Sequence, residues 1–184
     1  MLFRLLSKDE ILKILVTDMQ YDFHPSEIKS PELIQRRIAE GRYFARGLFE
    51  DDKLLVYAFF VKTEKYLLLD YLAVDRSVRG KGFGSLVLRY IAQMPEAQER
   101  ILILEVEDPD FSENERDRIR RIRRIGFYRH NGMCDLGIKT QVLTDNYLLL
   151  GASPASPDAT SHAIDLLYRT VYLPEFVQKH IIIK

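Results

Sequence analysis

The chain is poor in features that mark several specialised classes of protein. Among its 184 residues there is one cysteine, Cys134, so an internal disulfide is excluded and a reducing compartment, the cytoplasm, is expected. Lysine plus arginine and aspartate plus glutamate number 27 each, and the resulting net charge of zero favours neither nucleic acid nor an anionic membrane as partner. Runs of about 18 apolar residues, the length of a membrane span, are absent from the sequence.

The composition is otherwise that of a globular protein. Hydrophobic residues make up 47% and charged residues 29% of the chain, which is compatible with a substantial core. The N-terminal segment is apolar, but Arg4 and Lys8 interrupt it, so it is interpreted as leading into a helix and not as a signal peptide, with a first strand at residues 1–6 as the alternative. We expect one domain over residues 1–152. Residues 153–184 are expected to form a Ser/Pro/Ala-rich linker and a helix that packs on the same domain.

Hydrophobic periodicity predicts alternating helices and strands. Helices are predicted for residues 8–21, 32–40, 114–128 and 161–171, with one more directly after Gly84. Strands are predicted for residues 42–50, 54–63, 101–106, 133–140 and 147–152, with one more ending at Val74. Ser7 and Glu10 have the spacing of a capping box at the first helix. This order predicts an α/β fold, a mixed sheet of the α+β kind with helices on both faces.

A glycine-rich stretch between a strand and a helix is the most informative part of the chain. The strand ends at Val74, the sequence RGKGFG follows at residues 79–84, and an apolar helix pattern begins at once. A helix N-terminus presents unpaired backbone N–H groups and the positive end of its dipole, and glycine lets an anion approach the backbone closely. Arg79 and Lys81 add mobile positive charge. The stretch therefore predicts a ligand that carries a pyrophosphate.

Several pyrophosphate-binding patterns do not fit this stretch. Its glycines at 80, 82 and 84 place the third one residue early for the dinucleotide pattern G-x-G-x-x-G. The P-loop pattern and the protein-kinase motifs are absent. A glycine-rich turn that only packs a helix closely on a sheet is the structural alternative.

The pattern [QR]-x-x-G-x-[GA], formed here by Arg79, Gly82 and Gly84, resembles that of the GNAT superfamily of N-acetyltransferases. The resemblance covers about residues 1–150 and implies a GNAT-like acyl-CoA N-acyltransferase fold with a C-terminal helical extension. It implies acetyl-CoA as co-substrate, with its pyrophosphate on the loop amides and its pantetheine arm along the preceding strand. The coenzyme-binding residues that it implies are Leu72, Val74, Arg79, Gly80, Lys81, Gly82, Gly84 and Ser85.

A second stretch carries the same resemblance. Family members often read L-E-V and later a helix that ends in [LF]-Y-x-x-x-G-[FM], as residues 104–106 and 127–133 do here. The resemblance implies that Tyr128 protonates the departing thiolate and that Glu105 removes the amine proton. Asp70 and Glu107 are rival bases. Residues 108–115 look inserted, and Arg121 stands where the family has an asparagine.

Arginine makes up half of residues 116–129. Ile119, Ile122 and Ile125 recur every three residues and predict one buried stripe. The rest of the helix is either a solvated basic face or an electropositive surface for the 3′-phosphate of the coenzyme, an acidic acceptor or RNA. Nucleic acid is not favoured, because no aromatic residues are interleaved before Phe127. The four histidines have no metal-ligand spacing, so no metal is expected.

These observations together predict a cytoplasmic acetyl-CoA-dependent N-acetyltransferase. It would transfer the acetyl group to a primary amine, small or peptidic, by direct attack in a ternary complex. A regulatory or sensor module that binds acyl-CoA without turnover is the alternative. Polyamine, antibiotic, amino acid and protein amine all remain open as acceptors. The apolar tail at 181–183 fits pairing with its own sheet or with a neighbouring chain, so a homodimer is left open.

Overall fold

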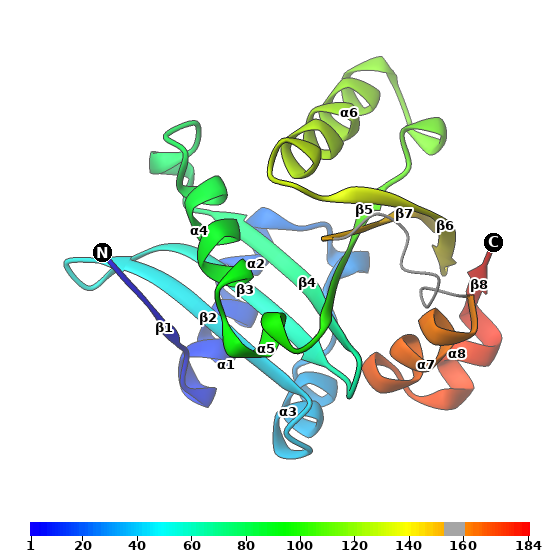
Figure 1. Cartoon of the computed structure of the whole chain (residues 1–184), viewed down its shortest axis with the longest axis horizontal. Coiled ribbons are helices and arrows are strands. Elements are labelled where there is room, and N and C mark those ends of the chain that lie inside the picture. The colour runs from blue at the N-terminus through cyan, green and yellow to red at the C-terminus, as the bar shows by residue number, and fades with distance from the viewer. Residues whose placement is uncertain (153–160) are drawn as a thin grey trace. The chain divides into compact units, whose positions relative to one another are not determined.

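The computed structural model describes residues 1–152 and 161–184 (Figure 1). The predicted linker at 153–160 lies outside the described residues. The fold is the expected mixed α/β fold with an open mixed sheet and helices. In the described part of the chain, no helix combines the length and the apolar character that crossing a bilayer requires.

The chain forms two compact units, which we call the first and the second unit. The first unit consists of Met1–Lys62 and Leu69–Met94, and the second of Thr63–Leu68 and Pro95–Lys184.

The first unit holds four strands in the order β1-β2-β3-β4. Its strands are β1 Leu2–Leu5, β2 Tyr43–Glu50, β3 Lys53–Lys62 and the later part of β4 Tyr66–Val74. Its helices are α1 Lys8–Val16, α2 Met19–Asp22, α3 Pro31–Ala39 and α4 Phe83–Ala92, with short 3₁₀ turns η1 Pro25–Glu27 and η2 Arg76–Val78. Figure 1 shows α4 in front of this sheet and α1, α2 and α3 behind it.

The beginning of the chain differs from the prediction. Residues 1–6 do not simply lead into a helix, because β1 pairs antiparallel with β2 from Leu2 opposite Phe49 to Leu5 opposite Arg46. A four-residue strand is too short to show a period of two clearly, and its pairing partner lies more than 40 residues away. The predicted first helix is also divided in two, since α1 ends at Val16 and α2 begins at Met19.

The predicted capping box is confirmed. The Glu10 amide donates to Ser7 Oγ at 3.2 Å, and the Ser7 amide donates to the Glu10 carboxylate at 2.7 Å. Arg4 donates two further hydrogen bonds to this carboxylate. The Arg4 bonds, followed by the Ser7 amide, lower the pKa of Glu10 to about 2. The negative charge at the start of α1 therefore persists well into the acidic range.

The second unit holds strands in the order β5-β7-β6-β8. They are β5 Ile101–Glu107, β7 Asp145–Gly151, β6 Cys134–Val142 and β8 Ile181–Ile183. Its helices are α5 Pro95–Gln98, α6 Glu115–His130, α7 Ser161–Val171 and α8 Pro174–His180, with the 3₁₀ turn η3 Pro109–Phe111. The predicted helix at 161–171 is confirmed. The apolar tail pairs with its own sheet, since Ile183 lies opposite Thr140 of β6.

Each unit has an apolar core built from strand and helix faces. In the first unit, α4 buries Val87 and Ile91, and the hairpin of β2 and β3 buries a run of large side chains. In the second unit, Ile103 of β5 and Ile164 of α7 have no exposed surface. Burying one such side chain contributes roughly 1.5–3 kcal/mol to folding, so these faces hold each unit together.

Candidate functional site

The glycine-rich loop between β4 and α4 is open toward an approaching ligand. Gly80 has φ of 77° and Gly82 has φ of 84°, a left-handed conformation that other residues adopt at a cost. A Cβ built on either glycine would meet no atom within 4 Å. Gly82 is the N-cap of α4 and supplies no side-chain hydrogen bond to it. The first amides of α4 are therefore not covered by a capping side chain, and the loop fits an anion.

Lys81 immediately precedes the N-cap Gly82, and Ser85 belongs to the first turn of α4. The Lys81 side chain is exposed, and Ser85 is half-buried in the first turn of α4 with Gly84 before it. An exposed ammonium and a hydroxyl beside uncapped amides suit a diphosphate group chemically. Binding of a pyrophosphate at this loop stays a prediction.

The Arg79 side chain forms an ion pair and a hydrogen bond within the protein. Its Nη2 forms an ion pair with Asp22 Oδ1 at 2.6 Å, and its Nε donates to the Val74 carbonyl oxygen at 2.9 Å. The sequence predicted a mobile cation here, whereas the structure uses the guanidinium to tie the loop to the end of β4 and to α2. The side chain is half exposed, so one side of it remains accessible.

The end of β4 shows a regular alternation of burial. Tyr71 and Ala73 are buried, and Leu72 and Val74 between and after them are half-buried. The two predicted pantetheine-contacting residues therefore share one face of the strand.

A cavity of about 220 Å³ lies in the first unit beside the loop. Three carboxylates reach its lining from Asp18, Asp22 and Asp75, and Tyr57 of β3 donates a hydrogen bond to Asp22 Oδ2 at 3.0 Å. Burial, and next the charge of Asp22, raise the pKa of Tyr57 well above its usual value. The remaining lining residues are Tyr21, Leu54, Leu55 and Arg76. Cations of the unit already pair with two of these carboxylates, since Arg79 contacts Asp22 and Lys53 lies 3.5 Å from Asp75.

Asp70, a rival base, belongs to a buried polar network. Lys29 Nζ lies 2.7 Å from Asp70 Oδ1, and the two side chains are 8% and 2% exposed. The Tyr43 hydroxyl donates to Asp70 Oδ2 at 2.5 Å. The Tyr71 hydroxyl accepts the Lys29 amide and donates to the Glu27 carbonyl oxygen. The network attaches the segment before α3 to β4, and the Asp70 carboxylate is already ion-paired.

Glu105 of β5 is held from the C-terminal helix. The Tyr168 hydroxyl of α7 donates to Glu105 Oε1, and the Thr140 hydroxyl lies 3.3 Å from the same oxygen. Tyr168 is 1% exposed, and burial, followed by the charge of Glu105, raises its pKa well above 10. Sequence reasoning missed Tyr168, because a tyrosine on an amphipathic helix gives no sign of a carboxylate partner 63 residues away.

Tyr128 lies near the end of α6, which continues beyond the predicted residue 128 to His130. Its side chain is 8% exposed, and burial raises the pKa of its phenol to about 12, with the nearby Arg124 opposing the shift. The phenol is therefore protonated at neutral pH and can donate a proton.

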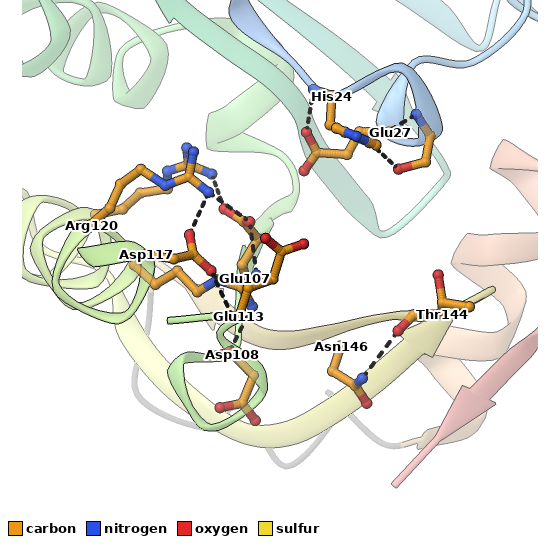
Figure 2. Close-up of polar contacts among 12 residues, drawn as sticks. His24, Glu27, Glu107, Asp108, Glu113, Asp117, Arg120, Thr144 and Asn146 are labelled. Atoms are coloured by element: carbon orange, nitrogen blue, oxygen red, sulfur yellow. Dashed lines mark hydrogen bonds and ion pairs between the residues drawn. The ribbon is translucent and has the colours of Figure 1, made fainter. Parts of the chain in front are cut away.

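Glu107, the other rival base, is surrounded by arginines of α6. Arg124 Nη1 lies 2.7 Å and Arg120 Nη2 3.5 Å from its carboxylate oxygens. Figure 2 shows Arg120 between Glu107 and Asp117, which Arg120 also contacts at 2.6 Å. Arg121, at the position of the family's asparagine, donates to the Asp108 carbonyl oxygen at 2.9 Å. Glu107 is thus committed to charge pairing.

Two further predictions concern this region. The expected buried stripe of α6 is wrong in part, because Ile125 is buried but Ile119 and Ile122 are 42% and 44% exposed. The inner face of the helix is instead occupied by ion pairs with Glu107. Within the described ranges, no group of three or more histidine, cysteine, aspartate or glutamate residues is arranged to hold a metal ion.

Comparisons with known proteins address the family directly. Residues 8–132 match the model of the acetyltransferase (GNAT) family. No curated protein matches the chain significantly. An acetyltransferase of the GNAT family from Bacteroides thetaiotaomicron has a TM-score of 0.69 at 16% identity, over 95% of this chain and 99% of that one.

Two other solved structures resemble the chain in fold. The ribosomal-protein-S18-alanine N-acetyltransferase from Escherichia coli has a TM-score of 0.60 at 17% identity, over 86% of this chain and 98% of that one. An aminoglycoside 6'-N-acetyltransferase complexed with coenzyme A has a TM-score of 0.57 at 14% identity, over 85% and 99%. The family model spans most of the chain and includes the glycine-rich loop and Tyr128, and the chain belongs to the GNAT acetyltransferase family.

Proposed function

We propose that the protein is an N-acetyltransferase that moves an acetyl group from acetyl-CoA to a primary amine by direct attack in a ternary complex. The observation that carries the proposal is the loop at Gly80–Gly82, left-handed and open, in front of an α4 N-terminus that has no capping side chain. Membership of the GNAT family supports it, and so does the coenzyme A held by a protein of similar fold.

In this proposal the coenzyme supplies the acetyl group as an activated thioester. The amides around residues 80–85 and the Lys81 ammonium would hold its pyrophosphate. The half-buried face of β4 with Leu72 and Val74 would lie along its pantetheine arm. Arg79 would act indirectly, by fixing the loop through Asp22 and the Val74 carbonyl.

The reaction forms a carbon–nitrogen bond, breaks the carbon–sulfur bond and transfers one proton from nitrogen to sulfur. An amine attacks only when it is neutral, so a base near the acceptor assists. We assign Glu105 to that role because it holds the position that the family resemblance indicates; its rivals Asp70 and Glu107 are ion-paired to cations. Tyr128 would protonate the departing thiolate, since the raised pKa keeps its phenol protonated. Holding the amine and the thioester next to each other would itself contribute much of the rate acceleration, whichever groups act as base and acid.

A sensor that binds acyl-CoA without turnover is the second candidate. The observation in its favour is that the Glu105 carboxylate already accepts a hydrogen bond from the buried Tyr168 hydroxyl. A carboxylate so occupied is less available as a base.

Thiol release from acetyl-CoA with a panel of amines separates the two candidates. The panel includes polyamines, because polyamines are among the acceptors that the sequence leaves open. An enzyme releases thiol at a rate that rises with the concentration of at least one of the amines. A sensor binds acetyl-CoA, as calorimetry detects, yet releases no thiol with any amine of the panel.

Replacing Tyr128 with phenylalanine is expected to lower kcat about 100-fold, because general acids contribute about 10²–10⁴-fold. Such an acid works below its pKa and fails as pH rises through it. With a pKa of about 12, wild-type kcat should show no tyrosine-dependent decline up to pH about 10. The control is Tyr90→Phe, which keeps the ring stacked on Phe3 and should leave kcat unchanged. An unaltered kcat in Tyr128→Phe would remove Tyr128 from the mechanism.

A further inference from the structure

The arginines of α6 differ in how their charge is balanced. The helix carries seven arginines, and five of them form ion pairs with carboxylates of the second unit: Arg118, Arg120, Arg121, Arg124 and Arg129. Within the part of the chain that the structure describes, Arg116 and Arg123 form no ion pair, and both are exposed. The helix therefore carries uncompensated positive charge at two positions.

These two arginines lie on one face together with exposed apolar residues. Arg116, Ile119 and Arg123 are spaced three and four residues apart, so they form one line along the helix, and Ile122 lies beside it. Ile119 and Ile122 are 42% and 44% exposed. We call these four residues the outer stripe of α6.

The ion pairs with Glu107 lie on the other face of the helix, while the exposed pair of Glu115 and Arg118 borders the outer stripe. Figure 2 shows Asp117 and Arg120 directed toward Glu107 of β5. Arg124, two turns after Asp117 on that side, also pairs with Glu107, whereas Asp117 pairs with Arg121 of the helix itself. Ion pairing within the unit therefore orders the inner face and leaves the outer stripe with its cations and isoleucines uncovered.

We propose that the outer stripe is a docking surface for an acidic amphipathic peptide segment of a partner protein. Two apolar side chains between two unbalanced cations complement a segment in which apolar residues lie between carboxylates one heptad apart. A second copy of the chain is a poor occupant, because pairing of α6 with itself would bring arginine against arginine. The surface is independent of the acetyl transfer proposed above.

The composition of the stripe also disfavours RNA as the occupant. Single-stranded nucleic acid binds to aromatic platforms and to longer runs of cations. The stripe has aliphatic side chains and two cations. A peptide can bury the isoleucines and pair both guanidinium groups at once, as Arg suits bidentate pairing with carboxylates.

The test uses two fluorescein-labelled synthetic peptides. One is amphipathic, with two leucines between glutamates one heptad apart, and the other is a scrambled peptide of the same composition. Fluorescence anisotropy with the full chain at low salt is expected to show binding of the amphipathic peptide, with a Kd below about 100 μM. The scrambled peptide should bind at least about tenfold more weakly, and added salt should weaken binding of the amphipathic peptide.

Two variants and one control assign the binding to the stripe. The double variant Arg116→Glu/Arg123→Glu and, separately, Ile119→Ser/Ile122→Ser should each lose about tenfold or more in affinity for the amphipathic peptide. Arg129→Glu changes an exposed arginine near the end of the same helix, six residues beyond Arg123, and should bind the peptide like wild type. Unchanged coenzyme A binding in all three shows that they are folded.

Three results would overturn the proposal. They are no binding of the amphipathic peptide at about 1 mM, equal binding of the scrambled peptide, and equal affinity of the two double variants and wild type. Tighter binding of poly(U) RNA than of the peptide at the same salt concentration, lost in the arginine variant, would assign the stripe to nucleic acid instead.

Discussion

Replacing Gly82 with glutamate is expected to weaken coenzyme A binding about 1,000-fold, equivalent to about 4 kcal/mol. The residue has φ of 84°, and the space that its Cβ would enter is empty. A glutamate there would place a carboxylate where the pyrophosphate is proposed to lie, so like charges would repel. It would also block the amides of α4, and each hydrogen bond to a charged group is worth about 1.5–3 kcal/mol. Calorimetric titration with coenzyme A measures the effect.

Gly41→Glu is the matched control. Gly41 follows α3, has φ of 68°, and likewise has no atom within 4 Å of a built Cβ. Both substitutions therefore impose similar backbone strain and add the same charge. They differ in position, since Gly82 lies in the glycine-rich loop and Gly41 does not. Equal losses of coenzyme affinity in the two variants would show that strain is responsible and that the loop does not bind the diphosphate.

Breaking the buried pair of Lys29 and Asp70 is expected to cost about 3–5 kcal/mol of unfolding free energy. The two side chains are 8% and 2% exposed, so Lys29→Met leaves a buried carboxylate and Asp70→Leu leaves a buried ammonium. Either charge then lacks its opposite in a poorly solvated site. Urea denaturation followed by circular dichroism would record the lower midpoint of each single variant.

The double variant Lys29→Met/Asp70→Leu removes both charges and should be markedly more stable than the sum of the single losses predicts. The control is Arg36→Met, which removes a cation 61% exposed in its ion pair with Glu40 and should leave the midpoint unchanged. Losses in the double variant that simply add up would show that the two residues act independently. In that case the Asp70 carboxylate would again be a candidate base.

Features governed by short-range geometry could be predicted from the sequence. The loop at residues 79–84 was predicted because glycine and helix-start patterns act within a few residues. The strands at 42–50 and 54–63 were predicted from patterns of equally short range, and the structure joins them as a hairpin in which Asp51 and Asp52 take positive φ. The capping box of Ser7 and Glu10 is equally local.

Features that depend on partners far along the chain could not be predicted. Arg79 was expected to be mobile, but its partner Asp22 lies 57 residues earlier. Glu105 was assigned without Tyr168, which comes from the C-terminal extension. Ile119 and Ile122 were expected to be buried by their spacing alone. The spacing shows that these isoleucines share one side of the helix, but the ion pairs with Glu107 decided which side turns inward.

The sequence by itself determined that a helix begins in a glycine-rich loop after a strand, and that a tyrosine lies near the end of an arginine-rich helix. Backbone conformation and helix capping act between near neighbours, so residue order is sufficient for them. The tertiary structure alone decided which charged side chains form ion pairs. Asp70 is paired with Lys29, Glu107 with arginines, and Arg116 and Arg123 are left to solvent. Charge pairing acts through space, and which groups meet depends on how the elements pack.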